Sequence, residues 1–174
     1  MKSNRLTFPL ASLAAMLLSV SSVLGDDAAV NSSDKSFLQN AYEDGLAEVK
    51  AGELGQSKSA NADVKAFADH IVADHSKANA ELKTLSDNKK VSLSESPSLV
   101  AQAKGKLLDA KSGDSFDKAF ADAMVNDHKK AIEAFEKAAS EGKDPDVKAF
   151  AEKILPTLKM HLSMAEELQG KVGK

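Results

Sequence analysis

Four histidines are the side chains of this sequence whose type and spacing could do chemistry. A helix turns about 100° per residue, so spacing shows which side of a helix each residue occupies. His75 lies near the middle of one apolar stripe, His128 continues a second, and His161 lies on the flank of a third. His70 falls about a quarter-turn from its stripe and is expected to reach solvent. Three imidazoles are therefore expected to point inward, one from each of three helices.

Inward imidazoles from several helices are typical of a metal centre. Neutral imidazole is a common ligand of Zn, Cu, Fe and Ni, and helix bundles complete such sites with carboxylates from neighbouring helices. Glu48 and Glu53 flank the apolar stripe of the first helix. The pattern predicts a centre for a transition metal ion (Fe, Cu or Zn) with His75, His128 and His161 as ligands and Glu48 as a candidate fourth.

Two aspartates directly precede inward histidines, Asp74 before His75 and Asp127 before His128. Such carboxylates could lie at the rim of the site or hydrogen-bond to a ligand. The alternative to a metal centre is a set of core histidines whose ring nitrogens are satisfied by hydrogen bonds. The sequence leaves both interpretations open.

Residue types exclude or disfavour several other kinds of site. The sequence has no Cys, which excludes disulfides, thiolate metal sites and Cys nucleophiles. Di-iron bundles carry Glu three positions before a ligating His, whereas here those positions hold Val72, Val125 and Leu158. A hydrolase is disfavoured because no Gly-x-Ser-x-Gly motif is present.

The composition indicates one helical domain that does not bind nucleic acid. Its 174 residues suffice for one domain, and helix formers such as Ala, Lys and Leu dominate. A net charge of −3 argues against a surface for nucleic acid, which would need a basic face. The absence of Trp and the single Tyr disfavour base stacking.

Residues 1–25 have the pattern of a secretory signal peptide. Lys2 and Arg5 form a positive start, an uncharged and mostly apolar run follows, and small residues precede a cut after Gly25. The alternative is a retained membrane anchor, for which the run is of marginal length. Removing the leader takes two positive charges from the net charge of −3 and leaves −5. We expect an exported protein, periplasmic or secreted, whose mature form has no stable membrane span.

Helical patterns and breakers divide the remaining chain into a flexible lead-in at 26–33 and a bundle domain at 34–170. Long helices are predicted at 34–59, 63–87, 114–140 and 145–169, and a short one at 99–111. The segment Asp-Val-Lys-Ala-Phe-Ala at 63–68 recurs at 146–151, each time opening the second helix of a hairpin. The sequence predicts an all-α four-helix bundle of two similar hairpins, joined by a long crossover that carries the short helix.

Several motifs resemble the bacterial domain-of-unknown-function 4142 family. They are Glu-Val-Lys-Ala-Gly-Glu-Leu at 48–54, Val-Ala-Asp-His at 72–75, Met-Val-Asn-Asp-His at 124–128, and Leu-Pro-Thr-Leu at 155–158 before His161. The likeness covers residues 34–168. It implies an exported protein with a ferritin-like fold, and it places Glu48, His75, His128 and His161 on motif positions but not Glu53. The family has no settled biochemical activity, so the resemblance implies no reaction.

Two functions remain in competition at the level of sequence. One is an exported helical bundle that binds a metal ion through inward His and Glu side chains. The other is a non-enzymatic envelope or stress-related protein, structural or interacting with a partner, in which the histidines are hydrogen-bonded core residues. Neither interpretation specifies a protein partner or a homo-oligomer.

Overall fold

Five helices account for most of residues 30–173, the part of the chain that the computed structural model describes. They are α1 (Ser32–Lys58), α2 (Ala62–Asn88), α3 (Leu99–Asp109), α4 (Gly113–Glu141) and α5 (Pro145–Val172). No strand occurs within that range, which confirms the all-α class. The predicted signal peptide and the first residues of the predicted lead-in lie outside the described part.

Side-chain caps explain where the long helices begin. Asn31 caps α1 by accepting hydrogen bonds from the backbone N–H groups of Ser33 (2.9 Å) and Asp34 (3.1 Å). α1 therefore begins two residues before the predicted boundary. Asn61 caps α2 in the same way. Asp144 caps α5, where a proline occupies the first helical position as predicted.

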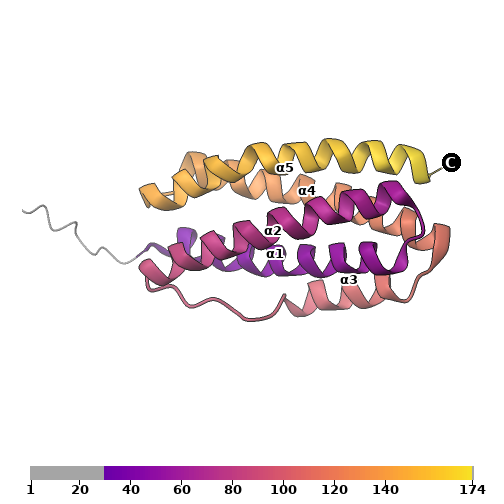
Figure 1. Ribbon diagram of the computed structural model, residues 1–174. Helices are drawn as coiled ribbons and strands as arrows, with labels where there is room; N and C mark the ends of the chain where they lie inside the picture. Colours follow the sequence, from indigo (N-terminus) through magenta and orange to yellow (C-terminus); the bar gives the residue numbers. More distant parts are fainter. Residues whose placement is uncertain (1–29, 174) are drawn as a thin grey trace, which may run out of the picture.

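The connection between the hairpins runs along the length of the bundle (Figure 1). α1 and α2 form one antiparallel hairpin, and α4 and α5 form the other. Residues 89–98 and α3 then lead back toward the end where α2 begins, so α4 runs parallel to α2. α2 packs on α5 and α1 packs on α4, which makes neighbouring long helices antiparallel. This is the ferritin-like bundle with a crossover that was predicted.

Glycines allow α1 to lie close to α2. Gly52 and Gly55 are buried on the face of α1 that meets α2. A Cβ atom at Gly55 would lie 2.8 Å from the Cβ atom of Ala68, and one at Gly52 would lie 2.7 Å from Cγ2 of Val72. Both distances are shorter than carbon–carbon contact allows, so the absence of a side chain sets the separation of the two helices.

Polar contacts join the two hairpins at one end of the bundle. The buried carboxylate of Asp34, in α1, accepts hydrogen bonds from the backbone N–H groups of Lys143 (2.9 Å) and Asp144 (2.7 Å) in the α4–α5 turn. Lys89, after α2, pairs with Asp144 (2.8 Å) and with Asp146 (2.7 Å) at the start of α5. The start of α1 and the end of α2 are thereby both bonded to the second hairpin.

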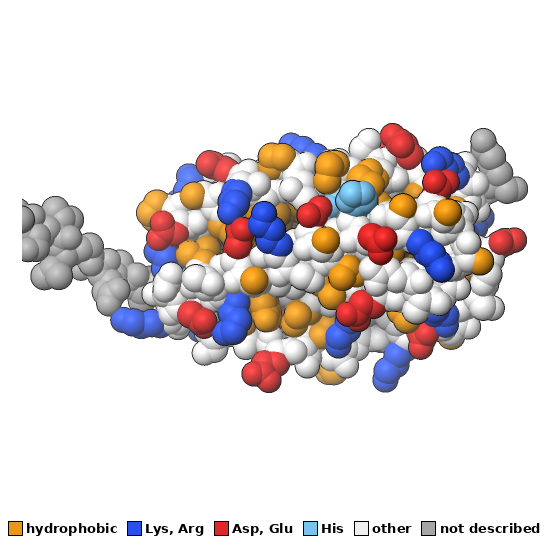
Figure 2. Space-filling view, in the orientation of Figure 1, with side chains coloured by type: hydrophobic (Ala, Val, Ile, Leu, Met, Phe, Trp, Pro, Cys, Tyr) orange, Lys and Arg blue, Asp and Glu red, His pale blue; other side chains and the backbone are white. Residues whose placement is uncertain are grey.

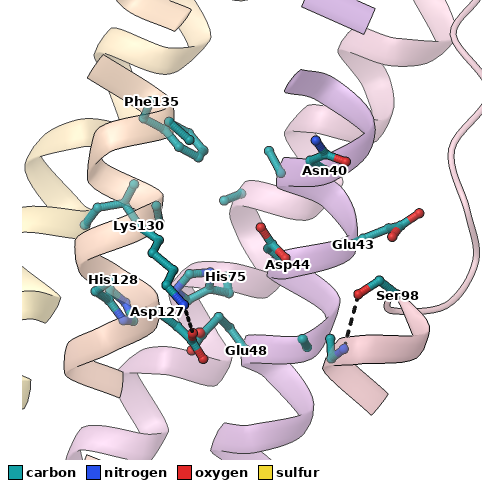
Figure 3. Close-up of a pocket in the computed structure, with 18 of the residues that line it drawn as sticks. Asn40, Glu43, Asp44, Glu48, His75, Ser98, Asp127, His128, Lys130 and Phe135 are labelled. Carbon is teal, nitrogen blue, oxygen red and sulfur yellow. Dashed lines mark hydrogen bonds and ion pairs between the residues drawn. The ribbon is translucent and has the colours of Figure 1, made fainter. Parts of the chain in front are cut away.

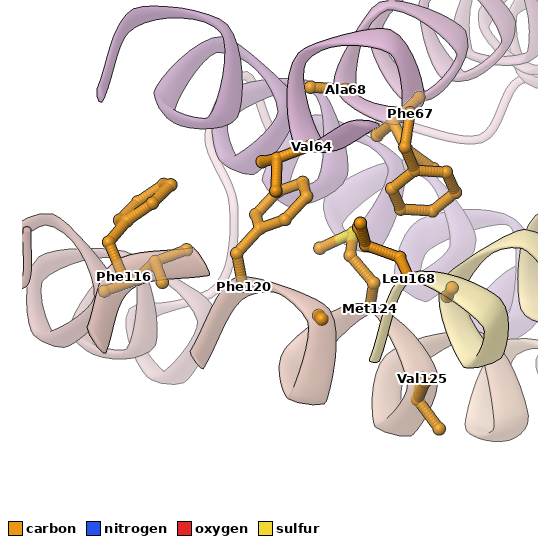
Figure 4. Packing of buried hydrophobic residues seen from close by; sticks show 12 residues of the cluster. Val64, Phe67, Ala68, Phe116, Phe120, Met124, Val125 and Leu168 are labelled. Carbon is orange, nitrogen blue, oxygen red and sulfur yellow. The ribbon is translucent and has the colours of Figure 1, made fainter. Parts of the chain in front are cut away.

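The apolar core consists of two clusters related to the sequence repeat. Phe67, from the first copy of the repeat, packs in one cluster, and Phe150, from the second copy, packs in the other. Because α2 and α5 are antiparallel, the two copies begin at opposite ends of the bundle. The first cluster is drawn in Figure 4 and includes Val64, Phe67, Ala68, Phe116, Phe120, Met124, Val125 and Leu168. The second includes Leu38, Leu82, Phe135, Val147, Phe150, Ala151 and Leu158.

The surface carries charges of both signs. Lys, Asp and Glu side chains are interspersed over the face drawn in Figure 2, with hydrophobic side chains scattered between them. The large apolar side chains that are most exposed belong to α3, namely Leu99, Val100 and Leu107. Among residues 30–173, no helix combines the length and the apolar character that a bilayer span requires.

Candidate metal centre

Three of the four histidines meet in the middle of the bundle. His75, His128 and His161 each lie near the midpoint of their helix, α2, α4 and α5 respectively. Their ring centroids are 5.5 Å apart for His75–His128, 5.5 Å for His75–His161 and 5.4 Å for His128–His161. His128 and His161 are 1% and 0% exposed, whereas His70 is exposed as predicted. The helical spacing thus identified the three rings that converge.

Hydrogen bonds fix the orientation and the tautomer of two of these rings. Nδ1 of His128 donates to the backbone carbonyl of Met124 at 2.9 Å. Nε2 of His161 donates to Oδ2 of Asp74 at 3.0 Å. A carbonyl or a carboxylate can only accept, so the proton of each neutral ring lies on the bonded nitrogen. The other nitrogen of each ring therefore keeps a free lone pair.

One nitrogen of each ring is buried and has no hydrogen-bond partner. These atoms are Nε2 of His75, Nε2 of His128 and Nδ1 of His161. Leaving one buried polar atom unpaired costs about 1–3 kcal/mol, so native structures avoid it. Three such atoms lie together in this one cluster.

Burial and the neighbouring rings hold the imidazoles in the neutral form. Burial, together with His128 and His161, lowers the pKa of His75 from 6.5 to about 3. Burial and then His161 lower the pKa of His128 to about 4. Burial also lowers the pKa of His161, although its bond to Asp74 acts in the opposite direction. Neutral imidazole is the form that binds a metal ion.

The spacing of the ring nitrogens suits one metal ion. One ligand atom from each of the three histidines lies within 4.8 Å of the other two. An ion placed centrally between three atoms at that spacing lies about 2.8 Å or less from each of them. A Zn–N bond is about 2.0–2.1 Å long. A movement of each ring by under about 1 Å would bring all three to bonding distance. The donor set is three neutral nitrogens from three helices.

Glu48 lies beside this cluster but outside the set of mutually close ligand atoms. Its Oε2 atom is buried and has no hydrogen-bond partner. Burial, followed by repulsion from Asp127 and Asp44, raises the pKa of Glu48 from 4.5 to about 8. The group of ligand atoms within 4.8 Å comprises His75, His128 and His161 without Glu48. Glu53, the weaker candidate in the sequence, is exposed.

A groove of about 960 Å³ leads to the cluster from the side of α1, α3 and α4 (Figure 3). Its lining includes His75 and His128, and Figure 3 shows Glu48 and Asp127 beside His75. Toward its other end the lining is apolar and includes Phe135. Nζ of Lys104, on α3, lies 2.9 Å from Oδ1 of Asp127. Two of the three histidines, His75 and His128, therefore border the groove.

The two aspartates that precede the inward histidines have different roles. Asp74 bonds to His161, on another helix, rather than to the adjacent His75. Asp127 lines the groove, where it pairs with Lys104. Sequence spacing indicated neither the Asp74–His161 pair nor the participation of Lys104, because both depend on how separate helices pack. A carboxylate behind a histidine is the arrangement that orients imidazole ligands in metal proteins.

Fold and site together define a four-helix bundle protein with a three-histidine cluster at its centre. The chain belongs to the family described as Domain of unknown function (DUF4142), whose sequence profile matches residues 20–168. This confirms the family that the sequence motifs resemble. No curated protein matches the sequence.

Solved structures with the same fold include a DUF305 fragment and CopM. A crystal structure of a DUF305 fragment from Deinococcus radiodurans has a TM-score of 0.73 at 14% identity, covering 82% of this chain and 98% of that one. CopM in the Cu(I)-bound form has a TM-score of 0.66 at 16% identity. CopM in the Cu(II)-bound form has a TM-score of 0.62 at 15% identity. The CopM matches each cover 79% of this chain and 96% of that one.

Proposed function

We propose that this protein binds one copper ion outside the cytoplasm, through His75, His128 and His161. The observation that carries the proposal is the cluster of three buried ring nitrogens without hydrogen-bond partners, one from each of three helices. The likeness of the fold to CopM, which is known in Cu(I)-bound and Cu(II)-bound forms, favours copper among the metals that imidazole binds. The location rests on the pattern of a signal peptide in residues 1–25.

The charge of the donor set favours Cu(I). Three neutral imidazoles bring no negative charge into a buried position, so the ion carries its full charge there. The cost of removing an ion from water grows with the square of its charge, so a monovalent ion costs about a quarter of a divalent one of equal size. Iron is disfavoured because no carboxylate belongs to the close set of ligand atoms.

The competing interpretation, buried histidines satisfied by hydrogen bonds, accounts for only part of the arrangement. It explains Nδ1 of His128, which bonds to Met124, and Nε2 of His161, which bonds to Asp74. It leaves Nε2 of His75 and the inward nitrogens of the other two rings unpaired. A metal ion satisfies all three lone pairs at once.

The proposal is tested by metal titration of the mature chain prepared without a histidine tag. Cu(I) is supplied anaerobically in competition with a chromophoric chelator, and Zn(II) is titrated in parallel. We expect one Cu(I) per chain. We expect His75→Ala to raise the Kd at least about 100-fold, because losing only a hydrogen-bond partner of a ligand already costs up to about 100-fold. His70→Ala is the matched control, because His70 lies on the same helix but is exposed.

Two outcomes would contradict the proposal. One is a wild-type chain that binds no Cu(I), or that binds Zn(II) stoichiometrically while leaving Cu(I) with the chelator. The other is an equal loss of copper in His70→Ala and His75→Ala, which would place the metal at the surface rather than in the cluster.

A further inference from the structure

The groove passes beside the three-histidine cluster on the α1–α4 side. His75 and His128 belong to its lining, whereas His161 does not. His161 is held from behind by Asp74 on α2. An ion that enters through the groove therefore meets the lining of α1 and α4 before it reaches His75 and His128.

Of the carboxyl groups that line the groove, three are close enough to act electrostatically on one another. We refer to Asp44 and Glu48 of α1 and Asp127 of α4 as the mouth carboxylates. All three line the groove, and Figure 3 shows Glu48 and Asp127 close together beside His75. Oε2 of Glu48 is buried without a hydrogen-bond partner, so the lining of the groove includes a polar atom that no protein group satisfies.

The ammonium group of Lys104, from the crossover helix α3, lies beside the mouth carboxylates. Nζ of Lys104 donates to Oδ1 of Asp127 at 2.9 Å. Lys104 also acts electrostatically on Asp44 and on Glu48. Lys130 is a more distant neighbour, 4.0 Å from Asp127, and its side chain is 72% exposed. Lys104 is thus the cation hydrogen-bonded among the mouth carboxylates in the metal-free protein.

We propose that the mouth carboxylates form a transit site for the copper ion and that Lys104 on α3 occupies this site until the ion displaces it. The inference rests on the proposed function, since it concerns how the ion reaches the three histidines. The exchange is one cation for another: the ammonium group leaves Asp127, the ion contacts the carboxylates, and it then passes to the imidazoles. Oxygen ligands hold soft copper less firmly than nitrogen ligands do, which favours onward transfer.

Lys104 is a residue of α3, and few contacts hold α3 to the rest of the bundle. This helix packs against α1 and α4 along the groove, and Lys58 pairs with Asp109 near its end at 2.8 Å. Leu99, Val100 and Leu107 remain exposed on it. Release of Asp127 by Lys104 therefore breaks a polar contact at the surface and needs no rearrangement of the core.

The test measures how fast copper enters and leaves at fixed pH. Cu(I) is transferred anaerobically from a weak chromophoric chelator, and its release is followed with an excess of a strong one at several concentrations. For Lys104→Met we expect both rate constants to rise about tenfold, the lower end of electrostatic effects on association, with Kd changed by less than about threefold. Lys106→Met is the control, because exposed Lys106 lies on α3 outside the groove lining.

A second variant removes a negative charge of the transit site instead of the positive charge of Lys104. Asp44→Asn removes a mouth carboxylate that lies on α1, whereas the hydrogen bond of Lys104 goes to Asp127. We expect copper to associate about threefold more slowly with this variant at low ionic strength.

The outcomes separate this inference from the proposed function. Wild-type protein that takes up no copper at equilibrium contradicts the proposed function. Normal equilibrium loading, with rate constants of Lys104→Met equal to those of Lys106→Met, overturns the transit site alone. An unchanged dissociation rate, with Kd lowered as much as association is accelerated, also overturns the exchange, since it shows only a general effect of charge.

Discussion

Asp74 determines which nitrogen of His161 faces the centre of the bundle. Its carboxylate takes the hydrogen of Nε2, so the lone pair of Nδ1 points toward the other two rings. The side chain of Asp74 is 38% exposed, whereas that of His161 is fully buried. Asp74 therefore links a buried imidazole to solvent, and we expect its removal to change metal affinity more than the stability of the fold.

Removal of that carboxylate should weaken metal binding. For Asp74→Ala we expect the Kd for Cu(I) to rise by about 10- to 100-fold, as is usual when the outer partner of a ligating histidine is lost. Asp69→Ala on the same helix is the control, because exposed Asp69 bonds to Gln56 instead. Equal affinities of the two variants, measured by chelator competition, would show that Asp74 does not orient His161.

The metal-free protein should lose stability on both sides of about pH 6.5. The folded-state pKa values of His75 and His128 are about 3 and 4, so below pH 6.5 the unfolded chain binds more protons and stability falls as the pH drops. The pKa of Glu48 is raised from 4.5 to about 8, so the folded chain binds more protons up to pH 8. Its contribution is fully present below pH 4.5 and is lost as the pH rises to 8. Each group changes stability by at most about 1.4 kcal/mol per pH unit.

Glu48→Gln separates the two effects. Wild-type protein should lose about 2 kcal/mol more than this variant between pH 6.5 and pH 8, since Gln does not titrate. Below pH 6 the histidines titrate in both proteins, but wild-type protein should lose less stability than the variant down to about pH 4.5, because folded Glu48 keeps its proton there and unfolded Glu48 does not. Denaturant unfolding at each pH, without metal, measures the difference. Equal slopes on the alkaline side would contradict a raised pKa for Glu48.

At the scale of single residues, the sequence predicted what one helix determines and missed what two helices share. The period of 3.6 residues identified the inward sides of His75, His128 and His161. The pairing of Asp74 with His161 spans 87 positions, so no local pattern contains it. Lys104 lies in the crossover, and its approach to Asp127 depends on the path of the connection.

At the scale of elements, the glycines of α1 determine how closely the first hairpin packs. Gly55→Ala would bring two Cβ atoms within 2.8 Å, and Ala68 cannot move its Cβ without moving the backbone of α2. Overpacking costs about 1–3 kcal/mol and the gain in helix propensity returns at most about 1 kcal/mol. We expect a net loss of stability, measured by chemical denaturation.

Gly105→Ala is the matched control for this substitution. Gly105 lies inside α3, and a Cβ there would meet nothing within 4 Å. The helix propensity of Ala should then stabilise α3 by about 0.5–1 kcal/mol. Stability changes of the same sign in both variants would show that close packing of α1 on α2 does not matter.

Helix positions were predicted well because their signals are local. Asn61 and Asp144 cap α2 and α5 close to the predicted helix starts at 63 and 145, and the turn around residue 142 separates α4 from α5. The boundary of α1 was two residues late because the cap at Asn31 was assigned to the lead-in. The direction of α4 relative to α2 could not be read from any motif. It follows from the path of residues 89–112 along the bundle.

At the scale of the whole molecule, a bound ion would stabilise the bundle by linking its two hairpins. His75 belongs to the first hairpin, and His128 and His161 belong to the second. At a free Cu(I) concentration of 100 times Kd, the folded state gains about 2.7 kcal/mol. We expect Tm to rise by about 5–10 °C in a chain of this size. Calorimetry of His75→Ala, in the same copper buffer, should show no such rise, and an equal rise would place the ion elsewhere.

The division of the three histidines between hairpins has a consequence for how the affinity arises. Covalent linkage through the crossover presents His75 to the other two rings at a high effective concentration, independent of the amount of protein. Two hairpins supplied as separate peptides would have to meet before the third nitrogen is in place, so their copper affinity would depend on dilution. The crossover would therefore make copper ligation a first-order property of one chain, with an affinity that does not change on dilution.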